Sequence, residues 1–358
     1  MSAPPPPPPS GTDPDPAGDD PATDAVVPDS FSAYVVTQDG DRIDAGVRVL
    51  DPDQLGADQV TIRVDWSAVN YKDAMVTRPG NRVARISPLI PGVDLTGTVL
   101  ASSDPSIAVG TQVIVHGYAL GVGHHGGFSQ LARVPAGWVV PLPTGMTDRQ
   151  AATIGTAGFT AALSLARLEM LGLSAVDGPV LVTGASGGVG SMAVALLAAR
   201  GYEVVASTGK SSEHAYLLGL GASEVIGRDA LVTMPERTLG AERWAGAVDC
   251  VGGSTLTAVL RTLRYGAAVA ASGLTGGNTF ESSVYPFIVR NASLIGIDTV
   301  STPIEERRRV WDHIATAFPP GPLDGMVDGE VGLDGLTSAL ERILAGKGRG
   351  RTLVVPDR

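Results

Sequence analysis

Residues 179–190 read PVLVTGASGGVG, and this stretch decides the fold. Its first part, Pro179–Thr183, is a continuous apolar run of the kind found in strands buried on both faces of a parallel sheet. Read from Ala185, the next residues fit A-x-G-x-x-G, the dinucleotide fingerprint with Ala in place of the first Gly. A helix-like segment, SMAVALLAARG, follows directly. The order of strand, glycine loop and helix is the context in which this fingerprint predicts a nucleotide site.

Two glycines of this loop have distinct expected tasks. We expect Gly187 to let the backbone approach a pyrophosphate and Gly190 to let the following helix pack closely against the sheet. The backbone N–H groups at the start of that helix then face the phosphates. The predicted phosphate contacts are Ser186, Gly187, Gly188, Val189 and Gly190. The alternative is a tight strand–helix turn that binds no ligand.

The end of the second strand indicates which nucleotide is bound. This strand is expected at residues 202–207, and no acidic residue follows it until Glu213. A site for NAD usually carries Asp or Glu here, about 20 residues after the glycine loop. Lys210, with the hydroxyls of Ser207 and Ser211, instead suits a ribose 2′-phosphate and predicts NADPH. The alternative is that Lys210 is a solvated loop lysine. We expect Arg228, after the third strand, to add charge near the adenosine.

The rest of the folded chain divides into two styles. Up to about residue 145, short strand-like runs alternate with Gly, Pro and Asp turns, which predicts a β-rich, barrel-like domain. A helix is expected over residues 148–173, interrupted at Gly155–Gly158, and strands then alternate with helices, as in a doubly wound α/β sheet. We therefore expect a β-rich domain at residues 31–150, a nucleotide-binding domain at 151–318, and a segment at 319–358 whose last strand returns to the first domain.

Residues 1–30 have a different composition from the rest of the 358-residue chain. They hold ten of its 26 prolines and six acidic residues, with no Lys or Arg. We predict that this tail is disordered, with polyproline II character; it is either a solubilising tail or a ligand for an SH3-like domain. The rest of the chain has 31 acidic and 26 basic residues, so its net charge is −5, compared with −11 for the whole chain. This acidic balance, without a basic stripe, argues against nucleic-acid binding.

The chain has no segment that predicts export or a membrane anchor. No apolar run reaches the length of a transmembrane helix, and the N-terminus lacks a signal-peptide pattern. Cys250 is the single cysteine, which excludes an intrachain disulfide and a cysteine-clustered zinc site. We expect a cytoplasmic protein in which Cys250 is a packed residue rather than a nucleophile.

Further motifs give the chain a family resemblance. They are NYKDA at 70–74, PGVDLTGTV at 91–99, GTAGFTA at 155–161, PFIVRN at 286–291 and GRTLV at 350–354. With the glycine loop, they make the chain resemble the zinc-free quinone oxidoreductase branch of the medium-chain dehydrogenase/reductase superfamily, and most closely its acrylyl-CoA reductase (NADPH) subgroup. The resemblance covers Phe31 to Val355.

The resemblance implies an architecture and a set of cofactor contacts. It implies a GroES-like catalytic domain, a Rossmann NADPH-binding domain, an active site in the cleft between them, and a homodimer formed through the last strand of the Rossmann sheet. It also implies that Tyr71, Ser211, Leu274, Ile288 and Arg351 lie near the cofactor. Zinc-dependent relatives use a Cys and a Gly-His-Glu motif, which this chain lacks. His116, His124 and His125 have no Cys or Glu at ligand spacing, so no metal site is expected.

Hydride chemistry without zinc favours an activated C=C bond as the acceptor. The hydride adds to the β-carbon, and the enolate needs a hydrogen-bond donor and then a proton at the α-carbon. We expect Tyr71 to position the substrate or relay that proton. Asn70 is expected to order the turn or donate to the substrate carbonyl, and Asp73 to hold the loop. For Asn70 and Asp73 a purely structural role is the alternative.

The expected function is NADPH-dependent reduction of a 2-enoyl thioester, acrylyl-CoA to propionyl-CoA. Arg78, Arg82 and Arg85 follow the NYKDA segment and either meet the CoA phosphates or form a solvated basic loop. The alternative activity is that of a quinone or generic enone reductase. A non-catalytic NADPH-binding or RNA-binding module is the alternative from another class of protein.

Overall fold

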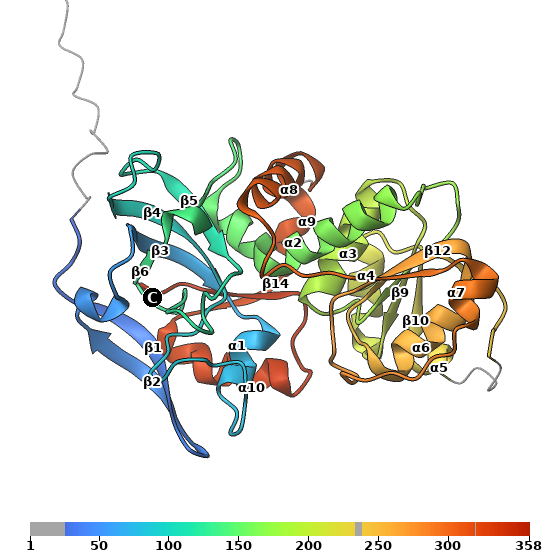
Figure 1. Cartoon of the computed structure of the whole chain (residues 1–358), viewed down its shortest axis with the longest axis horizontal. Helices are drawn as coiled ribbons and strands as arrows, with labels where there is room; N and C mark the ends of the chain where they lie inside the picture. The colour runs from blue at the N-terminus through green and yellow to red at the C-terminus, as the bar shows by residue number, and fades with distance from the viewer. Residues whose placement is uncertain (1–25, 233–237, 319) are drawn as a thin grey trace, which may run out of the picture.

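The computed structural model describes residues 26–232, 238–318 and 320–358. Residues 1–25 of the proline-rich tail lie outside the described part. The predicted disorder of the tail and its two interpretations therefore stay predictions. Figure 1 shows two lobes side by side, with the long helix α2 (Asp148–Met170) running from one to the other. One lobe carries the N-terminal strands and the C-terminus, and the other carries the parallel sheet.

The first lobe is built on an open, mainly antiparallel sheet. Its strand order is β14-β15-β3-β4-β5-β7, with β6 pairing to β3. The bounds are β3 Val60–Ala68, β4 Asp94–Ser102, β5 Gln112–His116, β6 Leu131–Val134, β7 Val140–Pro141, β14 Val327–Val331 and β15 Arg351–Val354. The strands β1 (Phe31–Asp39) and β2 (Arg42–Leu50) form a separate antiparallel hairpin. Two helices complete the lobe, α1 (Tyr71–Val76) and α10 (Leu336–Leu344).

The second lobe is a six-stranded parallel sheet in the order β10-β9-β8-β11-β12-β13. Its strands are β8 Val180–Thr183, β9 Val204–Thr208, β10 Glu224–Gly227, β11 Trp244–Asp249, β12 Leu263–Ala271 and β13 Ser293–Gly296. Its helices are α3 Gly188–Ala199, α4 His214–Gly219, α5 Asp229–Val232, α6 Gly253–Thr262 and α7 Tyr285–Arg290. The order reverses between β8 and β11, which is where doubly wound sheets bind ligands. The predicted fold class, a β-rich GroES-like domain with a Rossmann sheet, is confirmed.

Helix α2 connects the lobes and is kinked at Gly155. This residue has φ 46° and ψ −152° within the helix, in a region of backbone space that favours glycine. A Cβ at this position would lie 2.7 Å from Asp94 Oδ2 and 2.8 Å from Arg351 Nη2. The kink therefore brings the helix backbone directly against two charged side chains of the first lobe. The helix ends at Met170, three residues before the predicted end, and α8 (Ile304–Ala317) and α9 (Pro320–Gly325) pack near it.

The largest apolar cluster lies where α2 meets the parallel sheet. It includes Phe159 on α2, Met192 on α3, Val204 on β9 and Trp311 on α8, all essentially buried. The cluster also contains Ile114 of β5 and Val140 of β7, so it joins the two lobes into one packed unit. Burying each apolar side chain of this size contributes about 1.5–3 kcal/mol. Among the described residues, no helix is long and apolar enough to cross a membrane.

The end of the chain returns to the first lobe. β15 pairs antiparallel with β3, with Leu353 opposite Ala68, and β14 extends the sheet by pairing with β15. β14 has the sequence VDGEV, which carries two acidic residues and a glycine and gave no strand signal. A 3₁₀ turn at Leu333–Gly335 leads directly into α10. The return of β15 places Arg351 beside the kink of α2.

Candidate cofactor and substrate site

The glycine loop lies between β8 and α3, at the carboxyl end of the parallel sheet. Gly190 must be glycine, because a Cβ there would lie 2.4 Å from the carbonyl oxygen of Gly184 and 2.6 Å from Ala185 Cα. Gly187 stands at the N-cap of α3, and no side chain caps the helix. The N–H groups of the first turn are therefore available to an anion. A Cβ on Gly188 would be 3.4 Å from Arg351 Nη1, so the start of this helix also adjoins the first lobe.

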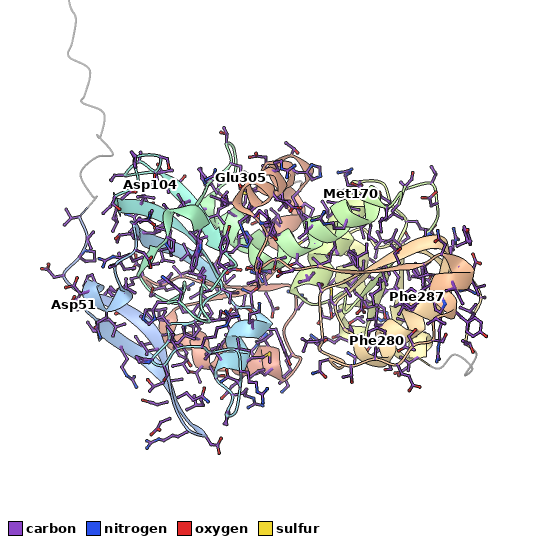
Figure 2. All side chains as sticks on the ribbon, in the orientation of Figure 1. Asp51, Asp104, Met170, Phe280, Phe287 and Glu305 are labelled. Atoms are coloured by element: carbon purple, nitrogen blue, oxygen red, sulfur yellow. The ribbon has the colours of Figure 1, made fainter. Side chains whose placement is uncertain are left out.

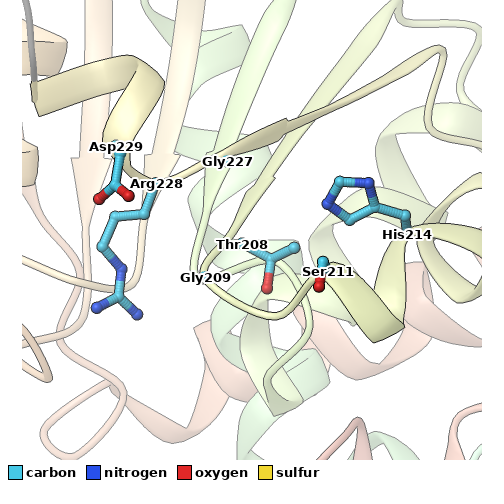
Figure 3. A pocket seen from close by; sticks show the side chains of 7 residues that line it. All are labelled: Thr208, Gly209, Ser211, His214, Gly227, Arg228 and Asp229. Carbon is cyan, nitrogen blue, oxygen red and sulfur yellow. The ribbon is translucent and has the colours of Figure 1, made fainter.

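A pocket of about 310 Å³ lies at the carboxyl ends of β9 and β10 (Figure 3). Its lining residues are Thr208, Gly209, Ser211, His214, Gly227, Arg228 and Asp229. The Arg228 guanidinium lies along Gly209, where a Cβ would be 3.1 Å from Nη2. Its side chain makes no hydrogen bond or ion pair with any described residue. Ser211 and Arg228, both predicted to contact the cofactor, are thus brought together at the place expected for the adenosine end.

Lys210 does not line this pocket. Its Nζ donates a hydrogen bond to the carbonyl oxygen of Gly348, in the loop before β15. Gly350 in the same loop donates its N–H to the Ser186 carbonyl at 3.0 Å. Burial lowers the pKa of the Lys210 ammonium, and Glu213 opposes this effect. In this structure Lys210 therefore ties the C-terminal loop to the nucleotide-binding lobe.

The two serines predicted nearer the phosphates are buried. The Ser186 hydroxyl is 2.9 Å from that of Thr208 and so links the glycine loop to the end of β9. Ser207 is buried within β9 itself. Leu274 lies in the loop after β12, where a Cβ on Gly252 would be 3.4 Å from its Cα, and its side chain is exposed. Ile288 is exposed on α7.

The turn at Asn70, where α1 begins, is held by Asp73. Its Oδ2 accepts the N–H of Asn70 at 2.8 Å, and its Oδ1 accepts the N–H groups of Gly92 and Val93 at 3.1 and 3.0 Å. Burial, and then the charge of Asp94, raises the pKa of Asp73 to about 7. Asp73 therefore joins α1 to the segment that leads into β4.

Both the nitrogen and the oxygen of the Asn70 side-chain amide form hydrogen bonds. Its Nδ2 donates to the carbonyl oxygen of Ala68 and to Asp94 Oδ2, both at 3.0 Å, and its Oδ1 accepts from Arg351 Nη1 at 3.0 Å. Both amide hydrogens are thus used within the protein. Arg351 is 2% exposed and also donates from Nε to the Thr153 carbonyl at 2.9 Å. Asn70 and Arg351 therefore order the junction between the lobes.

Tyr71 and the three arginines are more open to solvent. The Tyr71 side chain, at the start of α1, is 36% exposed, and its hydroxyl has no hydrogen-bond partner among the described residues. Arg78, Arg82 and Arg85 lie on the exposed loop that follows α1. None of the three forms an ion pair within the described part of the chain. A hydroxyl donor and three available cations thus occur within one short segment.

The three histidines of the first lobe have separate partners. His116 is buried; its Nε2 accepts from Trp311 Nε1 at 2.8 Å, and Arg307 Nη1 lies 2.8 Å from its Nδ1. Burial, with the charge of Arg307, lowers the pKa of His116 well below its usual value. His124 Nε2 lies 2.7 Å from Asp58 Oδ2, and His125 Nδ1 accepts the Ile90 N–H. No group of three His, Cys, Asp or Glu side chains in the described ranges is arranged to hold a metal.

Asp94 and Thr156 also lie at the junction of the two lobes. Sequence reasoning singled out neither Asp94, which receives hydrogen bonds from Ala68, Asn70 and Thr156, nor Thr156 itself. Asp94 could have been found from its position inside the PGVDLTGTV motif. Thr156 could have been found from its position directly after Gly155. Burial raises the pKa of Cys250 to about 12, so its thiol stays protonated at neutral pH.

Comparison with known proteins identifies the family. Residues 56–144 match the model of the alcohol dehydrogenase GroES-like domain, and residues 188–316 match that of the zinc-binding dehydrogenases. The chain is 45% identical to the putative quinone oxidoreductase YhfP of Bacillus subtilis over 324 residues, which cover 90% of this chain and 98% of that protein. It is 44% identical to the acrylyl-CoA reductase AcuI of Ruegeria pomeroyi over 326 residues, with the same two coverages.

Solved structures agree with this assignment. Escherichia coli YhdH with bound NADPH superposes with a TM-score of 0.87 at 43% identity, over 90% of this chain and 99% of that one. Bacillus subtilis YhfP with NAD bound gives a TM-score of 0.88 at 45% identity, over 91% and 99%. This chain therefore belongs to the medium-chain dehydrogenase/reductase superfamily, in the zinc-free branch that holds quinone oxidoreductases and acrylyl-CoA reductases.

Proposed function

We propose that this oxidoreductase uses NADPH to reduce the C=C bond of a 2-enoyl-CoA thioester, converting acrylyl-CoA to propionyl-CoA. The observation that carries the choice of a CoA ester is the set of Arg78, Arg82 and Arg85, which lies on the loop after α1 without a carboxylate partner among the described residues. A CoA ester brings phosphates that need cations, whereas a quinone brings none. The 44% identity to a protein named acrylyl-CoA reductase supports the same choice.

The cofactor site fits NADPH. The open first turn of α3 suits the pyrophosphate, and the pocket that holds Arg228 and Ser211 suits a 2′-phosphate. One relative was solved with NADPH and another with NAD. We therefore argue the preference of this chain for NADPH over NADH from its own pocket residues. NADPH, when bound, supplies the hydride that adds to the β-carbon of the substrate. Arg228 is the cation that we assign to the 2′-phosphate, since Lys210 is engaged by Gly348.

The residues of the first lobe then have complementary tasks. Asp73 fixes α1 against β4, and the network of Asn70, Asp94 and Arg351 fixes the turn that begins the helix. Tyr71 is thereby presented from a rigid turn with its hydroxyl unpaired. We assign to this hydroxyl the delivery of a proton to the substrate α-carbon, with water returning a proton to Tyr71. The 36% exposure of the side chain gives water access to it.

We also propose a homodimer formed through β13, in the cytoplasm. β13 is the edge strand of the parallel sheet. Phe287 lies on α7 at that end of the molecule (Figure 2), and Val284, Tyr285, Ile288 and Val289 form an exposed apolar surface there. Contiguous exposed apolar surface of this kind marks a protein interface. Sedimentation at the mass of one chain at micromolar concentration would contradict the dimer.

The proposed activity is tested by steady-state NADPH oxidation with three kinds of acceptor. We expect acrylyl-CoA to give a higher kcat/KM than a simple enone or a benzoquinone, and propionyl-CoA to be recovered as the product. A higher kcat/KM with the quinone would favour the quinone reductase that the YhfP relative is named for. Binding of NADPH without turnover of any acceptor would contradict both activities.

A further inference from the structure

Thr156 lies at the meeting point of the two lobes, directly after the kink at Gly155. Its backbone N–H donates to Asp94 Oδ2 at 2.9 Å, the oxygen that also accepts from Asn70. The next residue, Ala157, lies against the glycine loop, because a Cβ on Gly188 would be 3.4 Å from its Cβ. Thr156 therefore stands between the turn at Asn70 and the phosphate loop.

The Thr156 hydroxyl is shielded from solvent and has no hydrogen-bond partner among the described residues. The other three hydroxyls of α2 that are buried behave differently. Those of Thr153, Thr160 and Ser164 each donate to the carbonyl four residues earlier, at 2.6 to 2.8 Å. For Thr156 that carbonyl lies before the kink, where the non-helical backbone of Gly155 breaks the geometry. A buried hydroxyl without a partner in a native protein calls for an explanation, and a role toward a ligand is one of the explanations.

Most donors of this junction are engaged within the protein. Both amide hydrogens of Asn70 are used, and each nitrogen of the Arg351 guanidinium has at least one acceptor. Among the described residues, the hydroxyls of Tyr71 and Thr156 have no acceptor. Reduction of an enoyl thioester requires two such groups, one to stabilise the enolate oxygen and one to deliver the proton to the α-carbon.

We propose that the Thr156 hydroxyl donates a hydrogen bond to the thioester carbonyl oxygen of the substrate and stabilises the enolate; this rests on the proposed function. When hydride adds to the β-carbon, the C=C electron pair moves to form the enolate, and negative charge develops on that oxygen. Tyr71 then gives its proton to the α-carbon, the carbonyl re-forms, and water restores the Tyr71 proton.

The surroundings of the two hydroxyls explain why Thr156 is assigned to the enolate oxygen and Tyr71 to the proton transfer. The Thr156 hydroxyl is removed from water, where a fixed donor interacts more strongly with developing charge. It is also held on a helix whose backbone is bound to Asp94, so it needs little reorganisation. Tyr71 is partly exposed and can exchange protons with solvent. Thr156 is therefore the donor to the oxygen, and Tyr71 the proton donor.

Kinetics of matched variants test the assignment. We expect Thr156→Val to lower kcat with acrylyl-CoA by about 100-fold or more, the cost of removing one oxyanion donor, with the Kd for NADPH unchanged. Thr156→Ser keeps the hydroxyl and is expected to retain most of the activity. Thr262→Val is the control, because its buried hydroxyl donates to the Ala258 carbonyl at 2.8 Å on α6, away from the junction. Unchanged kcat in Thr156→Val would overturn the assignment.

A spectroscopic measurement separates the two hydroxyls. The carbonyl stretch of propionyl-CoA labelled with ¹³C at the carbonyl is expected to shift to lower wavenumber on binding to the wild type and to Tyr71→Phe, and not to Thr156→Val. Loss of the shift in Tyr71→Phe would overturn the assignment even if Thr156→Val failed to fold. A wild type that neither reduces an enoyl-CoA nor binds propionyl-CoA would contradict the proposed function itself, and the inference with it.

Discussion

Arg351 and Asp94 face each other at the junction of the two lobes, with Nη2 3.5 Å from Oδ2 and their side chains 2% and 4% exposed. They come from β15 and β4, which are distant in the sequence and belong to the same sheet. Each also contacts Asn70, and a Cβ on Gly155 would touch both. The pair therefore holds the turn at Asn70, the kink of α2 and the C-terminal strand in one arrangement.

Removing the cation of this pair is expected to be costly. Arg351→Met leaves the Asp94 carboxylate buried without its cation, and the carbonyl of Thr153 without its donor. Breaking a buried pair in this way costs about 3–5 kcal/mol of the free energy of unfolding, measured by denaturant titration. Arg342→Met is the control, because Arg342 pairs with Asp328 at 2.8 Å on the surface, where such a pair contributes about 1 kcal/mol or less. Equal losses in the two variants would contradict the account.

The pH dependence of stability is expected to report on Asp73. Its pKa is raised from 3.8 to about 7 in the folded state by burial and by Asp94. The folded state therefore binds this proton more tightly than the unfolded chain, and the stability that it contributes is lost as the pH rises from about 4 through 7. Asp73→Asn does not titrate. The free energy of unfolding of the wild type minus that of Asp73→Asn is thus expected to fall between about pH 4.5 and 7.5.

An exposed carboxyl serves as the control for this experiment. Hydrogen bonds from Ser106 lower the pKa of Asp104, so this group stays ionised in the folded and unfolded states across the same range. The difference between the wild type and Asp104→Asn is expected to be constant with pH. The prediction would be wrong if the free energy of unfolding of the wild type minus that of Asp73→Asn rose with pH. That result would mean that the three backbone N–H groups lower the pKa of Asp73 by more than its burial raises it.

Arg228 and Lys210 are expected to affect cofactor binding differently. Arg228 lines the pocket at the adenosine end, whereas Lys210 holds the carbonyl of Gly348. A hydrogen bond to a charged group contributes about 1.5–3 kcal/mol, so Arg228→Gln should raise the Kd for NADPH about 10–100-fold and leave that for NADH unchanged. Lys210→Met should change the two Kd values by the same factor. Fluorescence titration decides this, and a selective loss of NADPH binding in Lys210→Met alone would reverse the assignment.

The loop after α1 is expected to recognise the nucleotide part of CoA. Replacing Arg78, Arg82 and Arg85 together by Gln removes three exposed cations, each worth about 0.2–1 kcal/mol against a phosphate. KM for acrylyl-CoA should rise roughly tenfold, while kcat is preserved. Acrylyl-pantetheine, which lacks the nucleotide phosphates, is the matched substrate, and its KM should not change. An equal rise for both thioesters would mean that the loop acts through structure rather than charge.

The nucleotide-binding half could be predicted closely from sequence because its signals are local. A β-branched apolar run, the two fingerprint glycines at their fixed spacing and an apolar helix all lie within residues 179–201. The interruption at Gly155–Gly158 was visible for the same reason, since glycine punctuates a periodic helix. β14 was missed because VDGEV has no apolar alternation and becomes a strand only by pairing with β15.

The candidate site could be predicted only in part, because its contacts join distant segments. Lys210 follows the second strand and was predicted to contact the cofactor, but its ammonium donates a hydrogen bond to the carbonyl of Gly348, 138 residues away. Asn70 could be identified from the sequence as a candidate donor to the substrate. That its two amide hydrogens are bound by the Ala68 carbonyl and by Asp94 Oδ2 could not be predicted. The unpaired hydroxyl of Thr156 depends on the kink at Gly155, which is a matter of backbone geometry.

The central claim is that hydride from NADPH reaches the β-carbon of an enoyl-CoA. Its most direct test is to supply NADPH carrying deuterium at both C4 positions with acrylyl-CoA in ordinary water and to analyse the thioester by mass spectrometry and NMR. The account predicts propionyl-CoA with one deuterium at C3 and only solvent hydrogen added at C2. Recovery of unreduced acrylyl-CoA, or of a propionyl-CoA without deuterium at C3, would contradict it.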